Sequence, residues 1–150
     1  MGNDSLAPLP ADADIDRLLD NAPLAELAGI IQTHAEREAI RHSLERLEDE
    51  GRPDGELYSD QLTSTVGEMR GIYQRYLDEH APVTALQSLR ASHLATAQLT
   101  ATRYRAICAA RAAGESWSAI GAALDMSKQG AQDWYNKRSI PLLQDTAPAE

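Results

Sequence analysis

The side chains with the clearest chemical use lie between Ser127 and Arg138, in the stretch SKQGAQDWYNKR. Ala131, Trp134 and Tyr135 repeat there at helical spacing, which leaves the polar residues on the other faces of the same helix. Those polar residues are Ser127, Lys128, Gln129, Gln132, Asp133, Asn136, Lys137 and Arg138. In a DNA major groove a glutamine pairs with adenine and a lysine donates to guanine. Lys128, Gln129 and Gln132, on the first turns, are therefore candidates for reading base edges.

Basic side chains flank these residues. Arg103 and Arg105 precede them, and Lys137 and Arg138 end the stretch. Such side chains suit phosphates, which position a protein on DNA without reading its sequence. Asp133 is the exception, because phosphates repel a carboxylate. We expect it either to accept from a cytosine amino group or to pair with Lys137, four residues on.

Three helices must position these residues. The chain from Thr102 to Arg138 is punctuated by Gly114-Glu115-Ser116 and by Asp125-Met126-Ser127. Ser116 is a suitable N-cap for a helix over residues 117–124, and Ser127 for one over 128–138. Gly121, inside the first of these helices, leaves a spot narrow enough for another helix to cross closely. The three-residue turn makes the two helices cross steeply.

The stretch from Trp117 to Trp134 resembles bacterial helix-turn-helix DNA-binding domains, including the C-terminal promoter-reading domain of sigma factors. The shared pattern is a small residue in the first helix and apolar residues at set positions around the turn: Gly121, Leu124, Met126, Ala131 and Trp134. Where that family usually has glycine in the turn, this chain has Asp125, which tolerates the left-handed conformation better than most residues. The resemblance implies that helix 128–138 enters the major groove. The alternative is a three-helix domain that packs against protein.

The charge is unevenly distributed. Residues 1–102 hold 8 arginines and 18 acidic residues, a net of −10, although the whole chain is only −9. Residues 103–138 hold 6 basic and 3 acidic residues, and both lysines of the chain, Lys128 and Lys137, fall there. We therefore expect a local DNA footprint with weak, salt-sensitive non-specific affinity.

The rest of the chain is predicted to be helical. Residues 1–11 have two prolines and no periodicity, which favours a disordered leader. Asp12 or Asp14 then caps a short helix that ends before Pro23. The helix that follows, up to Gly51, has an apolar stripe that changes sides. It either breaks near 35–38 or serves a different partner at each end.

A heptad seam occupies the next helix, over residues 56–80, at Leu62, Val66, Met69, Tyr73 and Tyr76. The helix that covers it comes either from the same chain or from a second copy. Residues 82–113 form one helix or two, with an expected inner face of Val83, Leu86, Leu94, Ala97, Ala101, Tyr104 and Cys108. Residues 139–150 read as a loose tail.

Other chemistry finds little support. His34, Glu38, His42 and Glu45 form one helical row, but no second element completes a metal shell, so we expect neither metal nor cofactor. The single cysteine, Cys108, lies among apolar residues and reads as a small buried hydrophobe. No catalytic constellation, signal pattern or membrane-length apolar run is present, which predicts a cytoplasmic protein without enzymatic activity.

The sequence thus predicts an all-α fold: a leader at 1–11, an acidic helical association region at 12–99, a helix-turn-helix domain at 100–138, and a tail at 139–150. The predicted function is a sequence-specific transcriptional regulator that binds double-stranded DNA, as a homodimer through residues 23–99. The alternatives are an acidic adaptor that binds another protein, and a phage or plasmid protein for DNA packaging or partition.

Overall fold

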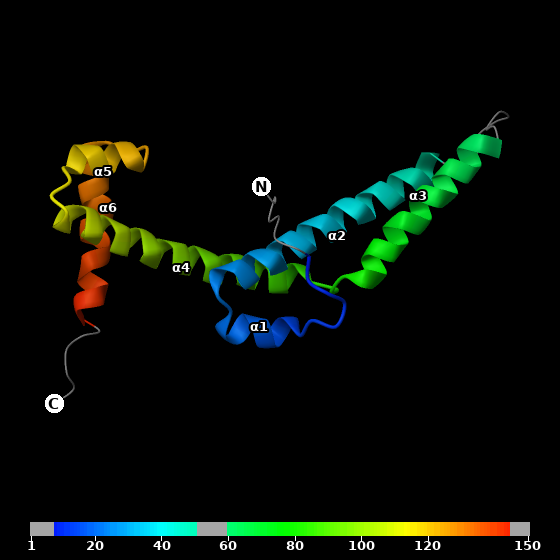
Figure 1. Ribbon diagram of the computed structural model, residues 1–150, viewed down its shortest axis with the longest axis horizontal. Coiled ribbons are helices and arrows are strands. Elements are labelled where there is room, and N and C mark those ends of the chain that lie inside the picture. The colour runs from blue at the N-terminus through cyan, green and yellow to red at the C-terminus, as the bar shows by residue number, and fades with distance from the viewer. Residues whose placement is uncertain (1–7, 51–59, 145–150) are drawn as a thin grey trace. The chain divides into compact units, whose positions relative to one another are not determined.

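The chain is all-α. The computed structural model describes residues 8–50 and 60–144, and those residues form six helices and no strand (Figure 1). The helices are α1 (Ile15–Asn21), α2 (Leu24–Glu50), α3 (Asp60–Glu79), α4 (Ala85–Ala112), α5 (Trp117–Ala123) and α6 (Lys128–Gln144). The side chains of residues 50, 60–63 and 139–144 lie outside the described part of these helices. Residues 1–96 and 97–150 form two compact units, and α4 contributes to both.

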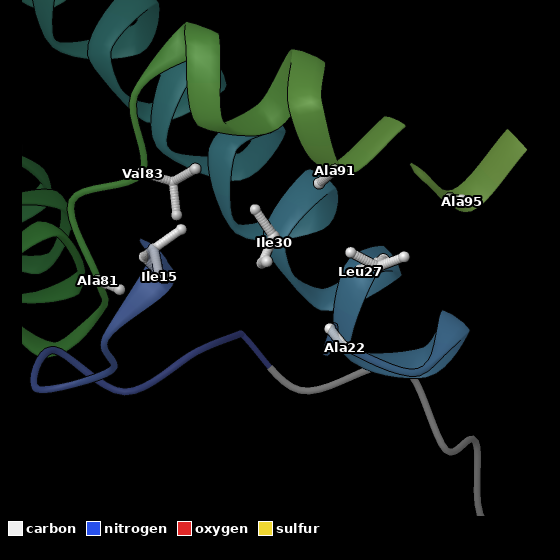
Figure 2. Packing of buried hydrophobic residues seen from close by; sticks show 8 residues of the cluster. All are labelled: Ile15, Ala22, Leu27, Ile30, Ala81, Val83, Ala91 and Ala95. Carbon is white, nitrogen blue, oxygen red and sulfur yellow. The ribbon is translucent and has the colours of Figure 1, made fainter. Parts of the chain in front are cut away.

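The core of the first unit lies where α1, α2 and the first turns of α4 meet. Leu27 and Ile30 on α2 are fully buried and pack with Ala91 on α4. Figure 2 shows Ile15 of α1 and Val83, just before α4, pointing toward one another at the edge of this cluster. Asp14 caps α1 by accepting from the backbone N–H of Arg17 at 3.1 Å, so of the two predicted candidates, Asp12 and Asp14, it is the second that forms the cap.

The long second helix does not break. α2 is continuous from Leu24 to Glu50, and α3 runs back along it in the opposite direction (Figure 1). Of the predicted seam, Val66, Tyr73 and Tyr76 are half-buried and Met69 is 38% exposed, while the side chain of Leu62 lies outside the described residues. The helix that packs against α3 is therefore α2 of the same chain.

The expectation of a disordered leader is wrong for residues 8–11, and residues 1–7 lie outside the described part of the chain. Pro10 forms an isolated antiparallel bridge with His80. The Leu9 N–H donates to Thr33 Oγ1 at 2.9 Å, and its C=O accepts from the N–H of Ala81 at 3.0 Å. Thr33 is fully buried and donates in turn to the Gly29 carbonyl, so its hydroxyl is satisfied both ways.

Two polar side chains of α2 hold the end of α3. Arg37 donates to the carbonyls of Leu77 at 2.6 Å and His80 at 2.8 Å, where the last helical turn leaves carbonyls without a helical partner. The Tyr76 hydroxyl donates to Glu36, and the Tyr76 ring stacks on His80 with centroids 4.0 Å apart. The hairpin of α2 and α3 is thus held by polar contacts as well as by its apolar seam.

α4 is one helix, which settles the alternative left open for residues 82–113. Its predicted inner face is partly wrong. Val83, Ala91 and Ala95 are buried, whereas Leu86 is 77% exposed and Ala97 and Ala101 are also exposed. Ala91 lies 140° around the helix from Leu86 at 100° per residue, so the core uses the side of α4 that carries the smaller residues.

The second unit has its own small core. Ile107 of α4, Ile120 of α5 and Ala131 of α6 are buried together. Four larger side chains pack around them and stay half-buried: Trp117, Leu124, Trp134 and Tyr135. Both tryptophans thus contact the core, but neither is enclosed by it.

Candidate nucleic-acid interface

The turn between α5 and α6 is built around Gly121. Ser116 caps α5 by accepting from the N–H of Ala119 at 3.1 Å. A Cβ at Gly121 would lie 2.8 Å from the carbonyl oxygen of Met126, so the backbone of the turn packs directly on this glycine. The sequence predicted that another helix crosses closely at Gly121, whereas the segment that lies against this glycine is the backbone of the turn itself, at Met126 and Ser127.

Asp125 has an unusual backbone conformation in this turn. It has φ 53°, the only positive φ of a non-glycine residue in the described chain. This left-handed conformation ends α5 and lets the N–H of Met126 reach back to the Gly121 carbonyl at 2.8 Å. Ser127 then starts α6 by accepting from the N–H of Gly130 at 2.9 Å. Both predicted caps are therefore present.

The candidate reading residues are spread over the outer faces of α6. Ser127, Lys128, Gln129, Asp133, Asn136 and Lys137 are exposed, while Gln132 and Arg138 are half-buried. Within the described residues, neither Lys128 nor Lys137 takes part in a hydrogen bond or ion pair. Both ammonium groups are thus available to an outside partner.

Asp133 has a partner that the sequence analysis did not choose. Its Oδ1 accepts from Gln129 Nε2 at 2.8 Å, four residues before it, whereas the two predicted partners were a cytosine amino group and Lys137, four residues after it. This hydrogen bond orients the Gln129 carboxamide and leaves its Oε1 and one N–H facing outward. The pair presents mostly acceptors, which suit the amino groups of adenine or cytosine.

Two arginines lie over the indole ring of Trp134. The Cζ of Arg138 lies 4.0 Å from the ring centroid and that of Arg103 lies 5.5 Å from it. Arg138 also donates to the Trp134 carbonyl at 3.3 Å. Sequence analysis placed both arginines near phosphates but assigned Trp134 only to the core. Arg103 and Trp134 lie 31 residues apart in the sequence, and the spacing of residues along the chain does not indicate that their side chains meet.

The other arginines of this unit differ. Arg105 donates within its own helix, to the carbonyl of Ala101 and the hydroxyl of Thr102, both at 3.4 Å. Arg111 lies 5.2 Å from the ring centroid of Trp117 and donates to the carbonyl of Glu115. Only Trp134, among the described residues, is contacted by two guanidinium groups.

Three aromatic side chains, Tyr104, Trp117 and Tyr135, contact one another and form an aromatic ladder. Tyr104 of α4 stacks on Tyr135 of α6 with centroids 5.1 Å apart, and Trp117 lies tilted against Tyr135 at 5.5 Å. The hydrogen bond with Tyr135 raises the pKa of Tyr104 to about 12, so the Tyr104 hydroxyl stays neutral at physiological pH. Cys108 is half-buried beside this ladder and not fully enclosed, which corrects the expectation of a buried hydrophobe.

Members of the predicted row of metal-binding residue types on α2 make contacts with other residues instead. His34 Nδ1 lies 3.1 Å from the Val83 carbonyl, and Glu38 pairs with Arg41 at 2.7 Å. In the described part of the chain, no group of three or more His, Cys, Asp or Glu side chains is placed to hold a metal ion. Nor do the described residues contain a helix long and apolar enough to cross a membrane.

Comparisons with protein-family models, curated proteins and solved structures found no match to this chain.

Proposed function

We propose that the chain is a sequence-specific DNA-binding transcriptional regulator, and that α6 reads the major groove. The observation that carries this proposal is the join of α5 to α6, where Gly121 accommodates the turn backbone and Asp125 takes the left-handed conformation. After this short connection Lys128 and Gln129 of α6 are exposed, while Ala131 packs in the core with Ile107 and Ile120, which is consistent with a helix that presents its first turn to DNA.

The charge distribution supports the same proposal. Residues 97–138 carry 6 basic and 3 acidic residues, and five of the six basic side chains are exposed. One such unit buries little surface on DNA, so two linked copies are the usual route to specific affinity. Self-association through residues 23–99 is therefore part of the proposal. Because the α3 seam lies against α2, the apolar surface left in that region includes Ile72, 61% exposed, and Leu86.

Selection of bound duplexes from a random pool tests the proposal. The wild-type full chain should enrich a defined site, whereas Lys128→Ala with Gln132→Ala should enrich a different or weaker one. Each lost base contact is expected to cost about 1–3 kcal/mol at its own base pair. Arg46→Ala, which removes an exposed basic side chain from α2, is the matched control and should leave the selected site unchanged.

If the wild type enriches no sequence, the DNA-reading role is wrong. An adaptor that grips another protein through the second unit then becomes the better function. A selected site that the double variant retains unchanged would keep DNA binding but remove these two residues from base reading. A packaging or partition role would instead show as binding without sequence enrichment.

A further inference from the structure

The arrangement at Trp134 places two positive charges close together without a counter-charge. Arg103 comes from α4 and Arg138 from α6, and both guanidinium groups lie over one indole ring. Since both distances are measured to the same centroid, the two Cζ atoms are less than about 10 Å apart, which is comparable to the Debye length of roughly 8–10 Å at 0.1–0.15 M salt. In the described residues, no carboxylate pairs with either arginine.

Like charges at this separation repel, and the ring offsets only part of the repulsion through its negative face. Contact with the indole restricts where both guanidinium groups can lie, which limits the side-chain entropy that a bound ligand must remove. Arg138 donates one N–H to the Trp134 carbonyl, and Arg103 makes no hydrogen bond within the described residues. Several N–H donors of the pair therefore remain free, because each guanidinium has five.

We propose that Arg103 and Arg138, held by Trp134, form a binding site for a phosphate oxyanion. A phosphate offers the negative charge that the pair lacks and the planar pairs of acceptor oxygens that a guanidinium matches. Two sources supply this group: the phosphodiester backbone of DNA, or a free phosphate. The DNA source rests on the function proposed above, whereas the oxyanion chemistry does not.

The oxyanion site is tested on the wild-type full chain by NMR. The chain is labelled with ¹⁵N and titrated with inorganic phosphate that replaces chloride at constant ionic strength. The arginine Nε–Hε signals of Arg103 and Arg138 and the indole signal of Trp134 should shift together and saturate. Arg111 and Trp117, a single arginine on a single ring at 5.2 Å, provide the internal control and should not respond in this way.

A second arm measures the affinity for a non-specific DNA duplex at several salt concentrations. Each phosphate contact contributes about 0.9 to the slope of log K against log salt. Arg103→Gln and Arg138→Gln should therefore each make the slope shallower by up to about 1, and Arg138→Lys should weaken binding although it keeps the charge. Arg111→Gln removes the same charge from the other ring and should leave the slope unchanged.

The possible results show separately whether the phosphate site exists and which molecule supplies the phosphate. Saturable phosphate shifts with an unchanged DNA slope support the site and assign it to a free phosphate. A shallower slope, with or without phosphate shifts, supports the site and assigns it to the DNA backbone. If the wild type binds no DNA, the proposed function fails and the phosphate titration alone decides the site. Equal shifts at all arginines, together with an unchanged slope, overturn the inference.

Discussion

At the scale of single residues, Gly121 and Gly71 make a matched pair. Both lie inside helices, but a Cβ at Gly121 would meet the Met126 carbonyl oxygen at 2.8 Å, whereas nothing lies within 4 Å of one at Gly71. Gly121→Ala should therefore destabilise the second unit by about 1–3 kcal/mol through overpacking. Gly71→Ala should stabilise α3 by about 0.5–1 kcal/mol, because alanine favours a helix over glycine.

Thermal unfolding of the two full-chain variants tests whether Gly121→Ala lowers the melting temperature and Gly71→Ala raises it. Asp125→Gly is a useful companion, since it relieves a left-handed aspartate and should raise the melting temperature. A Gly121→Ala variant as stable as wild type would mean that the turn backbone moves aside at little cost, and the tight join between α5 and α6 would lose its physical basis.

The contact between Glu36 and Tyr76 predicts a pH dependence of stability. Hydrogen bonding from Tyr76 and then from Gln32 holds the pKa of Glu36 below its ordinary 4.5. Desolvation, followed by the bond to Glu36, raises the pKa of Tyr76 above its ordinary 10.0. The Glu36 contribution is therefore complete above pH 4.5 and disappears as the pH falls through the lowered value. The Tyr76 contribution is complete below pH 10 and disappears at more alkaline pH.

Urea unfolding of wild type and Glu36→Gln near neutral pH and near pH 3 tests the acid side. Other carboxylates titrate in both proteins, so the difference between the two is the relevant quantity. Wild type should be the more stable protein near neutral pH, and its advantage should shrink in acid. An advantage that does not change with pH would show that the pKa of Glu36 is the same in the folded and unfolded states, which contradicts stabilisation of its ionised form by Tyr76 and Gln32.

At the scale of helices and turns, the features predicted correctly are those fixed by local chemistry. Ser116 and Ser127 were assigned as caps, and Asp14 was one of two candidates beside Asp12, because a short polar side chain satisfies N–H groups within the next three residues. Asp125 was expected to tolerate the left-handed region for similarly local reasons. These features fix where α5 begins, where it ends and where α6 starts, and hence the backbone of the candidate interface.

The features missed depend on contacts between distant segments. Leu86 was placed inside by the helical spacing of the apolar residues, yet the core of the first unit contains Ala91 and Ala95 of α4 and leaves Leu86 exposed. Leu9 looked unstructured because its hydrogen-bond partners, Thr33 and Ala81, lie 24 and 72 positions along the chain. In the candidate site, the pairing of Arg103 with Trp134 escaped prediction for the same reason.

Arg37 offers a prediction about a whole element. Its guanidinium donates to two carbonyls at the end of α3, those of Leu77 and His80. Arg37→Ala should leave these carbonyls without a protein donor, fray the last turn of α3 and loosen the bridge between Pro10 and His80. Hydrogen exchange of amides in residues 76–81 should accelerate, while exchange in α5 stays as in wild type. Uniform acceleration throughout the chain would indicate global destabilisation and not the loss of a cap.

At the scale of the whole molecule, the two units differ in charge. Residues 1–96 hold 8 arginines and 18 acidic residues, whereas residues 97–150 hold 6 basic and 5 acidic residues, a net of +1. The acidic unit repels phosphates, so it should limit non-specific binding and leave specific contacts to dominate. It also contains the region proposed for self-association, which makes its removal informative in two ways.

A fragment of residues 97–150 keeps the core of Ile107, Ile120 and Ala131 and loses the acidic unit. We expect it to bind non-specific duplex more tightly than the full chain at low salt, because a net charge of −10 no longer opposes the approach to DNA. If the removed unit links two copies, the fragment should be monomeric by light scattering. It should then lose preference for paired half-sites, because neither half gains from a tethered neighbour. Circular dichroism and a cooperative melt establish that the fragment is folded before binding is compared. A folded, monomeric fragment that selects the same paired sites with undiminished affinity would show that the first unit serves another purpose, and the adaptor function would gain.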